Sequence, residues 1–121
     1  MKIKNIKFKA KQLNSGKWFE GDLVRLGNRV CIGGDHIKDG ITDVDPSTVC
    51  QFTGLKDCKG KELFEHDLIH FVGFSDAAEV IWSEGNCAFM AVCENKHSYW
   101  LHDVIKICRI ERIGNKFDKE K

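Results

Sequence analysis

The sequence has little net charge and no long apolar run, and these absences exclude several classes of protein. Its 121 residues carry a formal net charge of +1, so no general positive field attracts nucleic acid or anionic membranes. No segment approaches the roughly 18 consecutive apolar residues of a membrane-spanning helix. Lysine alternates with apolar residues over residues 1–7, which is not the pattern of a secretory signal peptide. We therefore expect a cytoplasmic protein without membrane contact.

The six cysteines lack the spacings of common metal and redox sites. No Cys-x-x-Cys pair occurs, and without a signal peptide a disulfide framework is not expected. Phosphate-binding loops and dinucleotide fingerprints are absent from the sequence as well. Cys58 lies in a predicted turn, where it could be exposed. The cysteines predicted to be small buried hydrophobic residues are Cys31, Cys50, Cys93 and Cys108.

Helical periodicity is also scarce, and the pattern predicts an all-β protein. No segment keeps a 3.6-residue apolar period for more than one or two turns, whereas short apolar or alternating runs are separated by turn signals. Pro46, after Asp45, predicts a tight turn or a single helical turn, because proline fixes φ and aspartate can cap. We expect one domain over residues 1–115 and a charged, frayed tail over residues 116–121. The predicted strands cover residues 3–9, 17–26, 29–32, 49–53, 68–71, 77–82, 87–93, 99–101 and 103–113.

One stretch, residues 51–69, has a denser pattern than the rest of the chain. It reads Phe-Thr-Gly-Leu-Lys-Asp from Phe52, Gly-Lys-Glu-Leu-Phe from Gly60 and Glu-His-Asp-Leu-Ile from Glu65. This ungapped run resembles the signature of the YopX family, small proteins found mainly in bacteriophages and prophages. The resemblance implies a mostly β fold, a small SH3-like, strongly bent barrel of antiparallel strands. It implies no established activity.

The run departs from the family pattern at His66, where the family usually has glycine. If this position requires a positive φ, His66 carries some strain, although less than a β-branched residue would. We interpret the rest of the run as a structural motif, with turns at Gly54 and Gly60 and with Asp67 accepting backbone hydrogen bonds. The residues assigned to this motif are Thr53, Gly54, Leu55, Asp57, Gly60, Lys61, Phe64, Glu65 and Asp67.

An earlier segment resembles part of this run. Residues 16–24 and 60–69 both read Gly-Lys, a short spacer, Phe-Glu-x-Asp-Leu and a β-branched aliphatic residue. Each copy could be a bend that launches a strand, with the aspartate accepting hydrogen bonds at the turn. The repetition predicts a barrel built from two related half-units.

Histidine, cysteine and aspartate near the motif leave two catalytic alternatives open. His66 and His70 are four residues apart and could bind a metal with Cys58, but the metalloprotease pattern needs His-Glu-x-x-His on a helix. Cys58, His66 and Asp67 could also be drawn as nucleophile, base and orienting group. No oxyanion-forming neighbourhood marks that triple. We expect no catalytic, cofactor-binding or metal-binding residues.

The tryptophans could belong either to the core or to a binding surface. A small β domain usually buries its large aromatic residues, which favours the core for Trp18, Trp82 and Trp100. The alternative is a surface of rings and cations, which small β domains use to bind single strands or peptides. That surface would consist either of Tyr99 and Trp100 beside His97 and His102, or of Trp18 beside Lys17.

The expected function follows from the resemblance and from the lack of a catalytic constellation. Lys106, Arg109 and Arg112 make the last predicted strand basic, but Arg109 and Arg112 would face opposite sides of it, so no single basic patch is predicted. We expect a non-catalytic, phage-type module that binds a host or phage protein. One alternative is a nucleic-acid-binding small β-barrel, whose affinity would fall steeply with salt. A second alternative is a metal- or cysteine-dependent enzyme.

Overall fold

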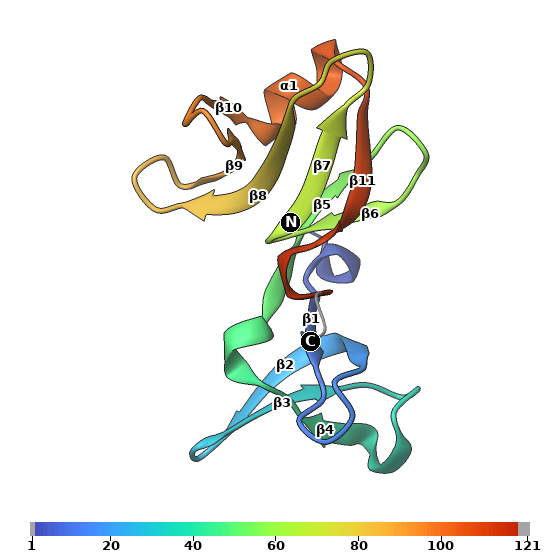
Figure 1. Cartoon of the computed structure of the whole chain (residues 1–121). Coiled ribbons are helices and arrows are strands. Elements are labelled where there is room, and N and C mark those ends of the chain that lie inside the picture. Colours follow the sequence, from blue (N-terminus) through green and yellow to red (C-terminus); the bar gives the residue numbers. More distant parts are fainter. Residues whose placement is uncertain (1, 119–121) are drawn as a thin grey trace. The chain divides into compact units, whose positions relative to one another are not determined.

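The computed structural model describes residues 2–118, and the chain forms two compact units (Figure 1). The first unit covers Met1–Phe52 and the second covers Thr53–Lys121. Almost all strand pairs are antiparallel neighbours, which confirms the predicted all-β class. Within residues 2–118, no helix has the length and apolar character needed to cross a membrane.

The first unit is a sheet in which the strands follow the order β4-β3-β2-β1-β5. Its small core contains Ala10, Ile32, Ile37 and Val44, with Phe8 and Phe19 packed against them. Asp45 caps a short helical turn, as predicted, because its carboxylate accepts the Ser47 N–H at 3.0 Å. The elements of this unit are η1 (Ile3–Asn5), β1 (Phe8–Lys11), β2 (Trp18–Leu26), β3 (Arg29–Gly33), η2 (Lys38–Gly40), β4 (Ile41–Asp43), η3 (Pro46–Thr48) and the start of β5 (Cys50–Lys56).

Strand β2 changes partner at Gly21. Its first half pairs with β1 up to Gly21, and its second half pairs with β3 from Asp22 opposite Gly33. A Cβ at Gly21 would overlap the carbonyl oxygen of Gly33, so only glycine allows β3 to approach this closely.

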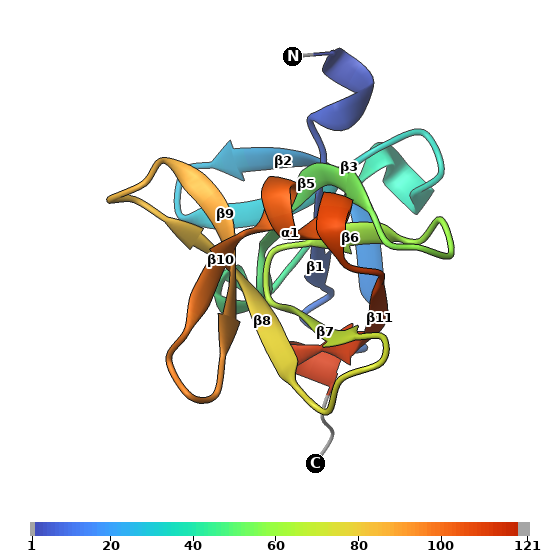
Figure 2. The same cartoon turned by 90° about the horizontal axis from the view of Figure 1, so that it is seen from above.

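The second unit contains a five-stranded sheet in the order β10-β9-β8-β7-β11. Helix α1 packs against β9 and β10, which Figure 2 shows beside it, and its Leu101 and Val104 enter the core with Leu63, Ile69 and Ile110. The remaining elements are β6 (Glu62–Phe64), which adjoins β5, β7 (Asp67–Phe71), β8 (Ala77–Ser83), β9 (Ala88–Cys93), β10 (Ser98–Trp100), α1 (Leu101–Ile107), β11 (Ile110–Asn115) and η4 (Lys116–Asp118).

The helix at residues 101–107 and the open sheets both differ from the predictions. Residues 101–107 are helical, not part of a strand over residues 103–113, because burial of Leu101 and Val104 on one face outweighs the β-branched composition. Neither sheet closes into a barrel within residues 2–118; both are open. The relation to SH3-like barrels stays a prediction, as does the single domain over residues 1–115.

The two segments that read alike do not adopt the same conformation. Gly21 lies inside the continuous strand β2, whereas His66 occupies a tight turn between β6 and β7. The predicted pair of equivalent bends is therefore wrong. The difference arises because β3 pairs with β2 directly beyond Gly21 and keeps that strand extended.

The cysteines and the charged tail follow their predictions in part. Cys31, Cys50 and Cys93 are buried and Cys58 is exposed, while Cys108 is only half-buried. Burial raises the pKa of the Cys31 and Cys93 thiols, which keeps them protonated. The tail begins with an ordered turn, since Lys116 N–H donates to the His66 carbonyl at 2.9 Å; residues 119–121 lie outside the described residues.

Replacing Gly21 with alanine should destabilise the protein by about 1–3 kcal/mol, because the added Cβ would press on Gly33 and Ile32. Urea unfolding followed by tryptophan fluorescence would measure this change. Gly85→Ala is the matched control, since no atom lies within 4 Å of its added Cβ, and it should change stability by less than about 0.5 kcal/mol. Equal stabilities of the two variants would contradict the close approach of β2 and β3.

Candidate binding surface of the second unit

The turn that follows β5 is built around the carboxylate of Asp57. Its Oδ1 accepts the backbone N–H groups of Lys59 at 2.9 Å and Lys61 at 2.8 Å, and its Oδ2 accepts that of Arg112 at 2.9 Å. The Cys58 N–H donates to the Ile110 carbonyl at 2.9 Å. These bonds join the turn to β11, more than fifty residues further along the chain.

Hydrogen bonding keeps Asp57 ionised. Burial acts to raise the pKa of this carboxyl, but the N–H groups of Arg112, Lys61 and Lys59 outweigh burial, and the pKa lies below its ordinary value. Outside the turn, Lys59 Nζ lies 2.5 Å from Glu111 Oε2, and this pair raises the pKa of Lys59 and lowers that of Glu111. Both of these side chains reach solvent, so their pairing adds little stability.

A second carboxylate, that of Asp67, is completely buried. Its Oδ2 accepts the Phe64 N–H at 2.7 Å, and its Oδ1 accepts the side-chain amide of Asn115 at 2.9 Å. Arg112 Nε lies 3.1 Å from Oδ2 but makes no hydrogen bond of good geometry there, so this contact is a charge interaction rather than a directed bond. Asp67 thereby holds both the β6–β7 turn and the end of β11.

His66 has φ 71°, the left-handed conformation that the family's glycine predicts. Its N–H donates to the Val80 carbonyl at 2.6 Å, and its ring Nδ1 lies 2.8 Å from Glu79 Oε2. The ring also packs edge-on against Phe117 with centroids 5.3 Å apart. These contacts of the ring are absent from a glycine at this position.

The remaining motif residues shape the hairpin formed by β5 and β6, which we call the signature hairpin. Thr53 Oγ1 donates to the Leu63 carbonyl at 2.7 Å and accepts the Leu55 N–H at 3.1 Å. Gly54 and Gly60 have φ 86° and 84°, conformations that favour glycine. Gly60 lies in the predicted turn, but Gly54 lies within strand β5, so the predicted turn at Gly54 is wrong. Phe64 is buried, Leu55 packs against the core, Lys61 is exposed, and Glu65 lies 3.8 Å from the His66 ring.

The structure separates the residues of the catalytic alternatives. The Asp67 carboxylate contacts Phe64, Asn115 and Arg112, whereas the His66 ring contacts Glu79. Among the described residues, no three histidine, cysteine, aspartate or glutamate side chains come together as metal ligands.

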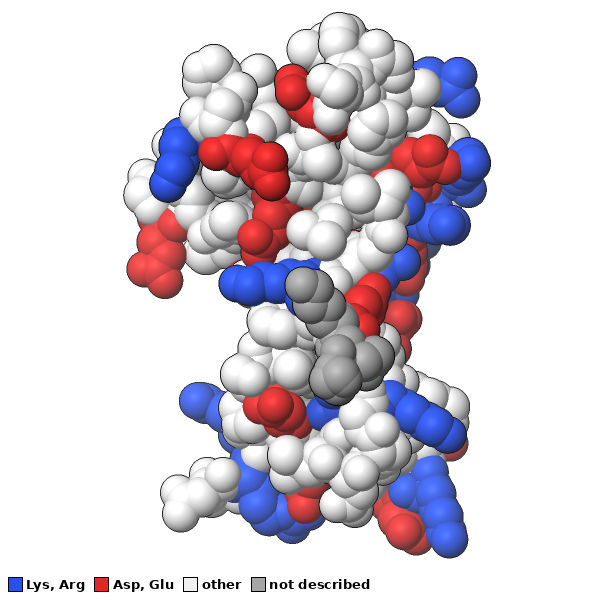
Figure 3. All heavy atoms as spheres, in the orientation of Figure 1, with Lys and Arg blue, Asp and Glu red and all other residues white. Residues whose placement is uncertain are grey.

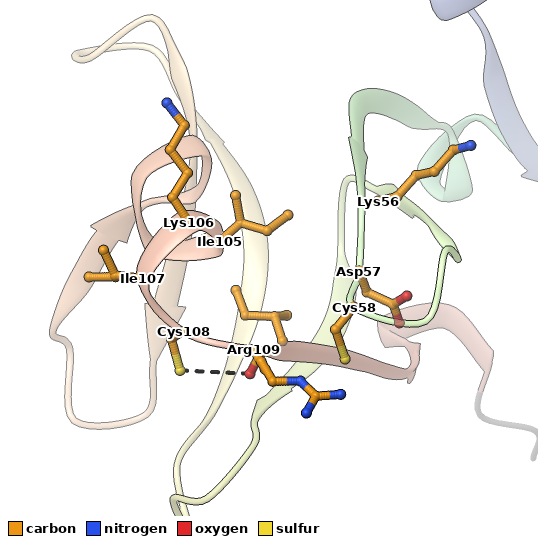
Figure 4. Close-up of a pocket in the computed structure, with 9 residues that line it drawn as sticks. Lys56, Asp57, Cys58, Ile105, Lys106, Ile107, Cys108 and Arg109 are labelled. Atoms are coloured by element: carbon orange, nitrogen blue, oxygen red, sulfur yellow. Dashed lines mark hydrogen bonds between the residues drawn. The ribbon is translucent and has the colours of Figure 1, made fainter.

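A pocket of about 300 Å³ lies between the Asp57 turn and the end of α1 (Figure 4). We call it the cationic pocket, because Lys56, Lys106 and Arg109 line it and all three are exposed. Its only carboxylate is that of Asp57, whose oxygens face backbone N–H groups. The other lining residues are Cys58, Ile105, Ile107, Cys108 and Ile110.

A second hollow of about 330 Å³, the apolar groove, lies on the other side of Ile107 and Cys108, which line both hollows. Buried Phe71 and Val104 form its floor, and Tyr99 packs edge-on against Phe71 at 6.2 Å. Three large side chains at its walls remain exposed: Ile107 by 84%, Phe74 by 63% and Tyr99 by 44%. Asp76 completes the lining of the apolar groove.

The tryptophans are less buried than the sequence predicts. Trp82 and Trp100 are exposed by 41% and 42%, so the core prediction is wrong for both. Trp82 packs edge-on against Phe89 at 5.0 Å, and Trp100 against His102 at 5.5 Å. Half-buried Trp18 lies beneath Nζ of Lys9, 4.6 Å from the ring centre, and Nζ of Lys11, at 5.6 Å.

Sequence reasoning missed the apolar groove. Its lining comes from three separated segments, residues 71–76, Tyr99 and residues 104–108, and only Tyr99 was a candidate residue. Arg112 was interpreted as part of a basic strand, but its side chain faces Asp67 and is unavailable to a ligand. The sequence did contain a signal for the groove. Leu101 is followed by Val104 and Ile105, three and four positions later, as on one face of a helix, and Ile107 follows Lys106 at the end of this segment.

Comparison with known proteins agrees with the signature. The family described as YopX protein matches residues 4–120, nearly the whole chain. The chain belongs to the YopX family. No curated protein matches it. In this YopX-family chain, the signature residues Asp57 and Asp67 bond the hairpin to β11, and the two hollows lie beside that junction.

Replacing Asp67 with alanine should destabilise this YopX-family chain by about 3–5 kcal/mol, because the Arg112 guanidinium and Asn115 amide lose a buried partner. Chemical denaturation monitored by circular dichroism would measure the loss. Asp35→Ala, at an exposed position, is the control and should stay within about 0.5 kcal/mol. A folded Asp67→Ala protein of unchanged stability that loses one activity would make Asp67 a functional residue instead.

The Asp57 carboxylate should give the protein an acid-sensitive contribution to stability. Because its folded pKa is lowered, the contribution is complete above the unfolded pKa of about 3.9 and is lost as pH falls through the folded pKa. The measurement is the free energy of unfolding of wild type and Asp57→Asn from neutral to acid pH. The wild type should be more stable at neutral pH, and the difference should shrink below about pH 4. A difference that stays constant down to the acid limit would contradict this assignment.

Proposed function

We propose that this YopX-family chain is a non-catalytic module that binds a host or phage protein through the apolar groove. The observation that carries the proposal is the exposure of Ile107, Phe74 and Tyr99 around one hollow. Ile107 is the most exposed of the three, at 84%. A contiguous apolar patch of this kind is typical of a protein-binding site.

Charge distribution favours a protein partner over nucleic acid. On the face drawn in Figure 3, acidic and basic side chains are interspersed within each unit, in keeping with the net charge of +1. The Trp18 ring, which could have stacked on a base, already has Lys9 and Lys11 over it. Both observations argue against nucleic-acid binding, and the experiment below would detect it if it occurred.

Affinity capture from a bacterial lysate, with and without nuclease, should recover a protein partner that survives nuclease treatment. Ile107→Asp should reduce recovery at least about tenfold, because an acid would be buried in the apolar groove. Leu13→Asp is the matched control: it places the same acid at an exposed leucine of the first unit, 60% exposed, and should leave recovery unchanged.

Two outcomes would contradict the proposal. Recovery that disappears with nuclease would favour nucleic-acid binding, with affinity expected to fall steeply with salt. Recovery that is equal for wild type and a folded Ile107→Asp variant would exclude the apolar groove as the docking site. Circular dichroism of each variant checks that it is folded.

A further inference from the structure

The apolar groove and the cationic pocket form one continuous surface. Both hollows are lined by Ile107 and Cys108, so a ligand that fills the groove reaches the pocket across the Ile107 side chain. A partner is therefore recognised by two chemistries at once, apolar burial on one side and charge on the other.

The charge on the pocket side is positive and available. Lys56, Lys106 and Arg109 are exposed, and within residues 2–118 none of the three has an ion-pair partner. The ionised Asp57 carboxylate offsets one of these three positive charges, and its two oxygens are already occupied by three backbone N–H groups, so the lining keeps a net positive charge. In Figure 4 the side chains of Lys56, Lys106 and Arg109 extend in different directions, so several acidic groups around this pocket would be needed to contact all three.

The apolar groove, in contrast to the cationic pocket, favours an apolar side chain over an acidic group. Asp76 is the acidic residue in its lining, and no lysine or arginine lines it. An acidic group there would meet Asp76, whereas a bulky apolar side chain would contact Phe71, Phe74 and Tyr99. Aromatic walls of this kind suit a tryptophan, phenylalanine or leucine anchor.

We infer that the partner presents a short acidic segment with one large apolar anchor: the anchor fills the apolar groove, and acidic residues on one side of it reach Lys56, Lys106 and Arg109. This inference rests on the proposed function and adds the chemistry of the partner. Since an extended chain advances about 3.3 Å per residue and the hollows are adjacent, the acids lie within about four residues of the anchor.

Selection of a displayed random-peptide library on the full chain tests the inference. The enriched sequences should combine a large apolar residue with aspartate or glutamate within about four residues of it. The best sequence, made as a fluorescent peptide, should bind the Lys106→Glu/Arg109→Glu variant at least about tenfold more weakly than wild type. The same peptide with its acids changed to amides should lose a similar factor, and added salt should weaken binding of the acidic form only.

The matched control is Lys17→Glu/Arg25→Glu, which makes the same change of charge at exposed positions of the first unit. It should leave peptide affinity within about twofold of wild type, because neither residue lines the apolar groove or the cationic pocket. Equal weakening by both double variants would mean that net charge alone matters, and would overturn the inference.

Other results would also overturn it. These are an enrichment of basic or uncharged peptides, no enrichment at all, or full affinity for the folded Lys106→Glu/Arg109→Glu variant. Failure of the inference is distinguishable from failure of the proposed function by lysate capture. If capture is lost with Ile107→Asp but unchanged with Lys106→Glu/Arg109→Glu, the groove binds a protein whose recognition does not use the cationic pocket.

Discussion

Arg112 connects the two buried carboxylates of the second unit, and the rest of that unit depends on this connection. Its backbone N–H donates to Asp57, and its side chain faces Asp67 at 3.1 Å. Asp57 closes the turn after β5, while Asp67 closes the turn between β6 and β7. One residue of β11 therefore fixes both turns of the family signature. Burying two carboxylates is costly unless each is paired, so the hairpin and β11 stabilise each other.

This connection also explains where the two hollows of the second unit lie. The Asp57 turn is bonded to Ile110 and Arg112, at the start of β11. Helix α1 ends at Ile107 directly before that strand, so its last turn is held close to the signature hairpin. The cationic pocket lies between the two, and the apolar groove lies on the far side of Ile107. The side chains of the proposed binding surface are thus supported by buried hydrogen bonds, which favours a preformed site.

Local chemistry made some features predictable. His66 has the positive φ that its alignment with a glycine indicated, and Pro46 follows a capping aspartate as expected. Alternating and short apolar runs identified the all-β class correctly. Helix α1 was missed because seven residues give only two turns of periodicity, with β-branched residues that also suit a strand. Exposure of Trp82 and Trp100 was missed because ring size predicts burial only when the neighbouring elements cover the ring.

Residues that are neighbours along the chain were enough to indicate the family, the β class and the positive φ of His66. Three features depend on long-range packing: the open sheets, the contacts of Arg112 with two aspartates and the exposure of Ile107. The groove joins residues from Phe71 to Cys108, and the Arg112–Asp57 bond spans 55 positions. Such contacts depend on how separate elements pack together, and the local pattern of the chain does not specify that packing.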